Sequence, residues 1–150
     1  MPRILEVHRE NFTISTDPAR LDSDAIAEML TRAYWARGRP RERVDRALAN
    51  SLVFGLYDGK KQIGLARVIS DYAIFAYLCD VFIHEDYRAQ GLGKLLMQTI
   101  HSHPDLQGLR RWTLATRDAH SLYSRFGWTS LNDPNSWMEI LNPFEGEGRD

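Results

Sequence analysis

The stretch Tyr77–Leu96 reads YLCDVFIHEDYRAQGLGKLL, and the other elements of the chain can be arranged around it. It begins with an apolar run that a single charge, Asp80, interrupts, and it continues through the polar turn 84–87. Gly91 and Gly93 follow, and then an amphipathic run begins whose apolar residues share one helical face. A strand, a glycine-bearing turn and a helix are therefore predicted. Such a turn aims backbone N–H groups and the positive end of a helix at one point, which suits a phosphate.

The glycine pattern narrows the kind of phosphate site. It matches neither the G-x-G-x-x-G of dinucleotide-binding folds nor the G-x-x-x-x-G-K-[ST] of P-loop proteins. What remains is R-x-x-G-x-G, formed by Arg88, Gly91 and Gly93. This pattern resembles the acyl-CoA pyrophosphate loop of the GNAT N-acetyltransferase superfamily.

Composition points to one globular domain over residues 1–150. The 150 residues are 43% hydrophobic and 26% charged, as in ordinary soluble proteins. A net charge of −1 gives no reason to expect a nucleic acid or an anionic membrane as partner. The first residues lack the apolar region of a secretory signal, and no apolar run approaches the ~20 residues that span a bilayer. The single cysteine, Cys79, fits a reducing compartment, so we expect a cytoplasmic protein.

Apolar periodicity and turn signals predict a mixed α/β sheet with helices on both faces, in the order β-αα-βββ-α-β-α-β-β. Helices are expected to begin at 22–23, near Pro40, after Gly91 and at Thr116. We expect an ordered core over about 10–141 and a disordered tail over 142–150. The predicted strands are 11–16, 52–57, 62–70, 77–83, 111–115, 128–131 and 137–141.

A second pattern lies downstream of the first. It consists of Thr116, Ala119, Leu122, Tyr123, Gly127 and Trp128, and it resembles the GNAT pattern N-x-x-A-x-x-L-Y-x-x-x-G-F. Thr116 replaces the usual Asn and Trp128 the usual Phe. The spacing of the two patterns also matches, so the resemblance covers roughly residues 10–141. It implies the GNAT fold, a mostly antiparallel, twisted central sheet flanked by helices.

The resemblance also implies roles for single residues. Acetyl-CoA would be the acyl donor, and no metal would be needed. Tyr123 would protonate the leaving sulfur, and a backbone N–H near Val81 would stabilise the oxyanion. The residues that the resemblance assigns to cofactor binding are Val81, Phe82, Ile83, Arg88, Ala89, Gln90, Gly91, Leu92, Gly93, Lys94, Thr116, His120 and Tyr123.

The general base stays open at this point. Asp80 is the only charge in a strand that is otherwise apolar on both faces, and desolvation can raise the pKa of such a carboxyl group. It is a candidate catalytic residue, but a structural carboxylate bonded to backbone or to an arginine is an equal alternative. Asp71, Glu85 and an ordered water compete for the role of base. Cys79 is interpreted as a small packed residue of the strand.

Residues 37–46 carry five arginines against Glu42 and Asp45, a local charge of +3. A solvated helix face is the ordinary reading of such a run. In the family that the chain resembles, however, this region walls the acceptor site, which makes Trp35, Arg37 and Arg39 candidate contacts of an acceptor that bears a carboxylate. Tyr77 is a further candidate substrate-binding residue. Trp35 could equally pack in the core.

These observations favour an acetyl-CoA-dependent N-acetyltransferase acting on a primary amine of a small metabolite, of amino-acid or polyamine type. A protein lysine or N-terminal amine is the alternative acceptor. A non-catalytic CoA-binding regulatory module on the same fold and a doubly wound nucleotide-binding protein are kept as rivals. A homodimer is possible.

Overall fold

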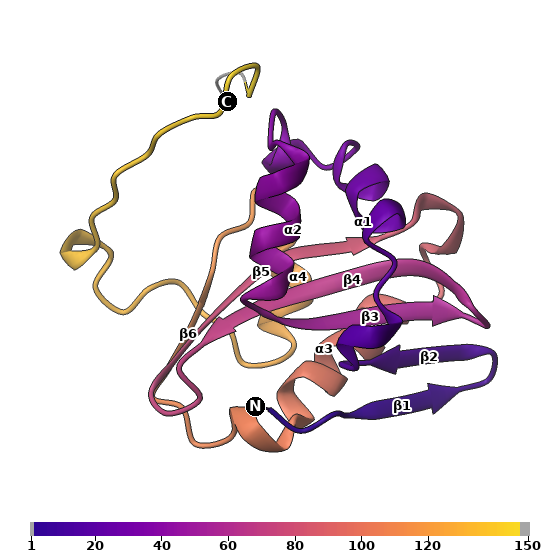
Figure 1. Ribbon diagram of the computed structural model, residues 1–150. Helices are drawn as coiled ribbons and strands as arrows, with labels where there is room; N and C mark the ends of the chain where they lie inside the picture. The colour runs from indigo at the N-terminus through magenta and orange to yellow at the C-terminus, as the bar shows by residue number, and fades with distance from the viewer. Residues whose placement is uncertain (1, 148–150) are drawn as a thin grey trace.

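A six-stranded sheet with the order β1-β2-β3-β4-β5-β6 forms the centre of the protein (Figure 1). The computed structural model describes residues 2–147. All neighbouring strands are antiparallel except β5 and β6, which are parallel. The expected mixed, mostly antiparallel sheet is thereby confirmed. The strands are β1 Glu6–Arg9, β2 Phe12–Ser15, β3 Leu52–Asp58, β4 Lys61–Ser70, β5 Phe75–Ile83 and β6 Arg111–Leu114.

Helices cover both faces of this sheet. On one face, Ile26 of α1 and Val44 of α2 pack with Phe82 of β5; on the other, Leu96 of α3 and Tyr123 of α4 pack around Phe54 of β3. The α1 helix begins where predicted, because the Asp22 side chain accepts a hydrogen bond from the Ala25 N–H. The helices are α1 Ser23–Leu30, α2 Arg41–Ala49, α3 Leu92–Ser102 and α4 His120–Ser124.

A β-bulge in β5 reverses which side chains face which helices. Leu65 pairs with Phe82 and Arg67 pairs with Cys79, so two residues of β5 lie opposite one residue of β4. At this point Asp80 adopts a positive φ of 51°, which is uncommon for a residue with a side chain. Before the bulge, Leu78 packs towards α3; after it, Phe82 packs towards α1 and α2. A strict period of two would have placed both residues on one face.

The parallel strands β5 and β6 pair over only four residues. Their register runs from Phe75 opposite Arg111 to Leu78 opposite Leu114. Beyond this last pair, β5 continues to Ile83, whereas β6 ends and the chain turns towards α4. The two strands therefore leave an opening between the second half of β5 and the segment that follows β6.

The predicted strands at 128–131 and 137–141 are wrong. Within residues 2–147 no strand follows β6, because this segment has no hydrogen-bonded neighbour in the chain. Its apolar side chains lie in solvent, with Met138 95% and Ile140 91% exposed. Figure 1 shows the segment, in yellow, looping out from the sheet and returning to the vicinity of α2. A segment with alternating apolar residues forms a strand only when the edge of another strand is available for pairing.

The structure differs from the sequence-based prediction in three further places: strand β1, the start of α4 and the C-terminal tail. The strand β1 was missed because its sequence, EVHR, is mostly polar. The helix expected from Thr116 begins only at His120, and the Thr116 hydroxyl accepts a hydrogen bond from the Ala119 N–H just before it. Residues 142–147 of the expected tail approach Gly38, where an added Cβ would lie 2.6 Å from the Glu145 carbonyl oxygen. Residues 148–150 lie outside the described residues.

Candidate active site

A cavity of about 710 Å³ occupies the opening between β5 and the segment after β6. One wall is the second half of β5, from Tyr77 to Ile83, and the opposite wall runs from Leu114 to Tyr123. Residues 32–35, between α1 and α2, close a third side. The divergence of the two parallel strands thus creates a hollow, and titratable side chains such as Asp80 and Tyr123 line it.

Asp80 is the buried charge at the centre of this wall. Its Oδ1 accepts a hydrogen bond from the Trp35 indole Nε1 at 2.9 Å. Its Oδ2 accepts from Arg39 Nη1 and from Arg67 Nε, both at 2.9 Å. The Asp80 side chain is only 3% exposed. Both carboxylate oxygens are therefore occupied by donors from α1–α2 and from β4.

The ionisation of Asp80 follows from these partners. Burial raises its pKa, but the attraction of Arg39 and Arg67 and their hydrogen bonds outweigh burial, so the pKa of Asp80 lies below its ordinary value. A carboxylate with a lowered pKa and both oxygens engaged is a weak acceptor for a substrate proton. The geometry favours the structural interpretation of Asp80: it holds two guanidinium groups and an indole at the cavity wall.

Tyr123 lines the opposite wall of the cavity. Burial raises the pKa of its phenol to about 12, so the hydroxyl remains protonated near neutral pH. Among the described residues, its hydroxyl makes no hydrogen bond that would engage the proton. The neighbouring Tyr34, by contrast, accepts a hydrogen bond from the Arg117 N–H. Tyr123 is thus a neutral hydroxyl that is available to a bound molecule.

The glycine-bearing turn before α3 has the geometry expected of an anion site. Gly91 adopts a φ of 76° immediately before the helix, a conformation that favours glycine. The Leu95 N–H bonds to the Gly91 carbonyl, so the N–H groups of the first turn of α3 have no partner within the helix. Arg88 donates from Nε to the Ile83 carbonyl at 3.0 Å and lines the cavity together with Gly93.

Most of the site residues expected from the sequence meet in this cavity. Those that line it are Trp35, Tyr77, Asp80, Val81, Phe82, Ile83, Arg88, Gly93, Thr116 and Tyr123. Arg37 and His120 are exposed and lie outside the lining. The side chain of Leu92 packs in the core, so only its backbone could meet a ligand. The remaining expected residues, Ala89, Gln90, Gly91 and Lys94, belong to the turn and the start of α3 outside the lining.

Sequence reasoning missed the two partners that hold Asp80. Arg67 was not singled out, and Arg39 was predicted to contact an acceptor carboxylate, not Asp80. A signal was present: Arg67 is the one charge between Gln62 and Val68, just as Asp80 is the one charge in β5. Opposite lone charges in two consecutive apolar strands of a hairpin predict a buried ion pair.

The other two candidate carboxylate bases, Asp71 and Glu85, already accept hydrogen bonds from other groups of the chain. Three backbone N–H groups, at residues 73–75, donate to Asp71 and lower its pKa. A hydrogen bond from Arg32 lowers the pKa of Glu85. Neither carboxylate lines the cavity. Cys79 does line it, but burial raises the pKa of its thiol to about 11, so the reactive thiolate is scarce near neutral pH.

Two features are absent from residues 2–147. No helix in this part of the chain is both long enough and apolar enough to cross a membrane. No group of three or more His, Cys, Asp or Glu side chains within it is placed to hold a metal ion.

Comparisons with known proteins point to one family. A family model described as "Acetyltransferase (GNAT) domain" matches residues 49–130. A protein of Gibberella zeae that is named an acetyltransferase is 33% identical over 140 residues, which cover 78% of each chain. The crystal structure of a protein from Xanthomonas campestris pv. campestris, assigned to the GNAT family, is 46% identical with a TM-score of 0.86, covering 91% of this chain and 96% of that one.

A further solved structure shares the fold at lower identity. It is a GNAT family acetyltransferase from Elizabethkingia anophelis with acetyl-CoA bound, 15% identical with a TM-score of 0.60. The match covers 79% of this chain and 76% of that one.

Proposed function

The chain belongs to the GNAT acetyltransferase family, and we propose that it is an acetyl-CoA-dependent N-acetyltransferase acting on a primary amine of a small metabolite, of amino-acid or polyamine type. The observation that carries this proposal is the position of Tyr123, a neutral hydroxyl facing β5 across the cavity. Proton donation to a leaving thiolate needs an acid of this kind at such a place.

The residues present fit acetyl-CoA. Unpaired N–H groups at the start of α3, together with Arg88, suit its pyrophosphate. The outer half of β5, from Val81 to Ile83, lies beyond the last pair with β6, so its backbone groups can hydrogen-bond to the amides of the pantetheine arm. When bound, acetyl-CoA supplies an acetyl group activated as a thioester.

The residues of the chain then have distinct tasks. Tyr123 delivers a proton to the departing sulfur, and a backbone N–H near Val81 stabilises negative charge on the carbonyl oxygen. Asp80 acts as a positioning residue, because it fixes Trp35, Arg39 and Arg67 at the cavity wall. The proton lost by the attacking amine passes to water in the cavity, since Asp80, the buried carboxylate of the cavity wall, already accepts three hydrogen bonds.

A screen for thiol release tests the proposal. The full chain is incubated with acetyl-CoA and a panel of amino acids, polyamines and peptides, and free CoA is measured over time. Release that depends on one class of amine supports the enzyme and identifies that class. If acetyl-CoA raises the melting temperature but no amine stimulates release, the protein is a CoA-binding module and the proposed activity is wrong.

A homodimer and a cytoplasmic location are part of the same proposal. Within residues 2–147, the outer edge of β6 has no strand partner, and the apolar side chains Met138, Ile140 and Leu141 lie exposed on an extended segment. Exchange of this segment between two copies would pair the edge and bury these side chains in both. The single cysteine, Cys79, supports a reducing compartment such as the cytoplasm.

A further inference from the structure

A second cavity, of about 470 Å³, adjoins the candidate active site on the side of α2. Four arginines line it: Arg39, Arg43 and Arg46 from the region of α2, and Arg67 from β4. Phe144, from the segment that returns to α2, contributes an aromatic side chain to its lining. The cavity is therefore cationic and has an apolar side.

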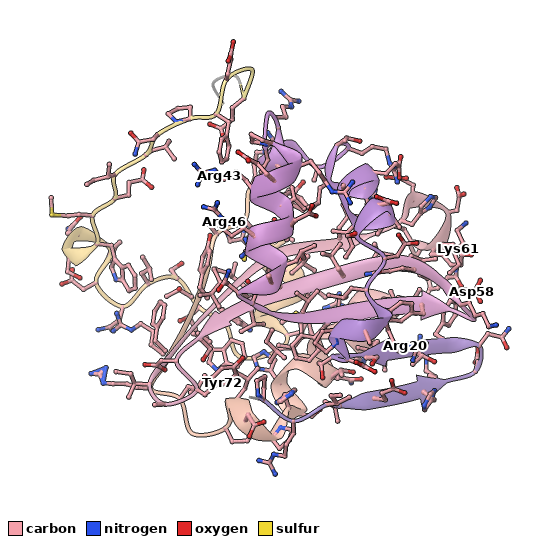
Figure 2. The ribbon with its side chains drawn as sticks, in the orientation of Figure 1. Arg20, Arg43, Arg46, Asp58, Lys61 and Tyr72 are labelled. Atoms are coloured by element: carbon pink, nitrogen blue, oxygen red, sulfur yellow. The ribbon has the colours of Figure 1, made fainter. Side chains whose placement is uncertain are left out.

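The spacing of the arginines explains why they converge. Arg43 and Arg46 are three positions apart in α2, which places them on one side of that helix, and Arg39 lies just before its start. Figure 2 shows Arg43 and Arg46 on the side of α2 that faces the C-terminal segment. Arg41 points elsewhere, since it pairs with Asp24 and Asp45. One face of α2 thus supplies the cavity while another carries ordinary surface ion pairs.

The charge of the second cavity is poorly compensated. No carboxylate lines it, and Arg43 and Arg46 form no ion pair with any residue between 2 and 147. Asp80 supplies one negative charge, which Arg39 and Arg67 share. Guanidinium groups that face a common hollow repel one another, and an anion placed among them removes that repulsion and gains charge-assisted hydrogen bonds.

The second cavity shares part of its wall with the candidate active site. Arg39 and Arg67 line both hollows, so the guanidinium groups that hold Asp80 also border the arginine cluster. The turn before α3, where the pyrophosphate of acetyl-CoA would bind, contributes Arg88 and Gly93 to the first cavity and nothing to the second. The second cavity therefore lies apart from the residues expected to bind the pyrophosphate.

We propose that the second cavity binds a carboxylate or phosphate group of the acceptor, so that the substrate class is a small amine bearing an anionic group. This inference rests on the proposed function, and it selects the amino-acid type of acceptor over the polyamine type. The amine would lie in the first cavity and the anionic group among Arg39, Arg43, Arg46 and Arg67. The apolar side chain of Phe144 would contact the carbon chain between them.

A binding experiment tests the site without catalysis. Inorganic phosphate and succinate are titrated at constant ionic strength into the full chain, its Arg43→Gln/Arg46→Gln variant and an Arg41→Gln control, and binding is followed by calorimetry. Saturable binding should weaken roughly 10- to 100-fold in the double variant and persist in the control. Absence of saturable binding in the unaltered chain, or equal binding in the double variant, overturns the inference. If phosphate binds only at the turn before α3, the double variant binds it as well as the unaltered chain does, and the inference is wrong.

A kinetic experiment tests the role in substrate choice. Values of kcat/KM are compared for alanine against alaninamide and for phosphoethanolamine against ethanolamine. The unaltered chain should prefer the anionic member of at least one pair, and the double variant should lose that preference while its rate with the neutral member is retained. Equal preference in both proteins overturns the inference. If no amine is acetylated although the anion binds and the double variant loses it, the proposed function fails and the anion site stands.

Discussion

Arg67 Nε lies 2.9 Å from Asp80 Oδ2 across the β4–β5 pair, at the point where the register of the two strands shifts. Both side chains are nearly buried, with exposed fractions of 12% and 3%. The bulge turns the Asp80 side chain to the face of the sheet on which Arg67 lies. The ion pair between the two residues therefore depends on the bulge. Replacing either residue should disturb the part of the wall that the two cavities share.

Asp80→Asn should therefore destabilise the protein. Removing one partner of a buried ion pair leaves uncompensated charge, at a cost of about 3–5 kcal/mol in the free energy of unfolding. Asp45→Asn, which breaks an exposed pair with Arg41, should cost about 1 kcal/mol or less. Denaturant titrations near neutral pH measure both. Similar losses in the two variants would contradict the importance of the buried cluster.

The same carboxylate predicts a dependence of stability on pH. The pKa of Asp80 is lower in the folded chain than its ordinary value of 3.8, so its stabilising contribution is complete above that pH. As the pH falls below 3.8 through the folded pKa, protonation removes this contribution. The unaltered chain should thus lose more stability between neutral and acidic pH than Asp80→Asn does. Parallel pH profiles for the two proteins would show that Asp80 is not stabilised as an anion.

Tyr123→Phe should lower turnover by about 10²- to 10⁴-fold, the usual contribution of a positioned general acid. Acetyl-CoA affinity should remain nearly unchanged, because the phenyl ring fills the same space. With a pKa of about 12, the hydroxyl stays protonated at any pH well below that value, so Tyr123 should cause no decline in rate near neutrality. Single-turnover rates and calorimetric titrations with acetyl-CoA separate the two effects. An unchanged rate would show that the proton comes from elsewhere.

Gly91→Ala should weaken acetyl-CoA binding. Gly91 has a φ of 76°, and an alanine in this region costs about 1–2 kcal/mol or shifts the turn that presents the N–H groups of α3. Gly108→Ala is a matched control, because Gly108 has a φ of 72°, nothing within 4 Å of an added Cβ, and a position outside the turn before α3. Both variants should lose similar stability, but only Gly91→Ala should lose the rise in melting temperature that acetyl-CoA produces. Equal ligand-induced shifts would exclude the turn as the pyrophosphate site.

Ile140→Glu should disrupt the proposed homodimer. Its side chain is 91% exposed in the single chain, so a charge there costs nothing until a second copy covers it. Ile4→Glu, at a site that is 59% exposed and far along the chain, is the control. Light scattering after size-exclusion chromatography should give a dimer for the unaltered chain and for Ile4→Glu, and a monomer for Ile140→Glu. A monomeric unaltered chain would rule the dimer out.

Local sequence signals were sufficient for much of the fold. The Asp22 cap, the start of α2 after Pro40 and the Gly91 turn before α3 each depend on residues within a few positions of one another. The main strands β3, β4 and β5 were predicted within two residues of their ends, because long apolar runs bounded by turns leave few alternatives. Residues of the two spaced patterns, Arg88 and Gly93 from one and Thr116 and Tyr123 from the other, line the same cavity.

Only the tertiary structure decided those features that depend on residues far apart in the sequence. The segment 137–141 has the alternation of a strand, yet it forms none within the described chain, because pairing requires an available edge. The role of Asp80 was open in the sequence, since the pKa of a buried carboxyl depends on which charges surround it. Only folding brings Arg39 and Arg67 to its oxygens, from 41 and 13 positions away.

The stretch from Tyr77 to Leu96 shows the same division. Its residues alone specify a strand, a turn and a helix, because those signals are local. That β5 bends at Asp80, separates from β6 after Leu78 and so creates a cavity was decided by contacts with strands far away in sequence. Periodicity cannot reveal a bulge, since one extra residue changes the face of every side chain after it.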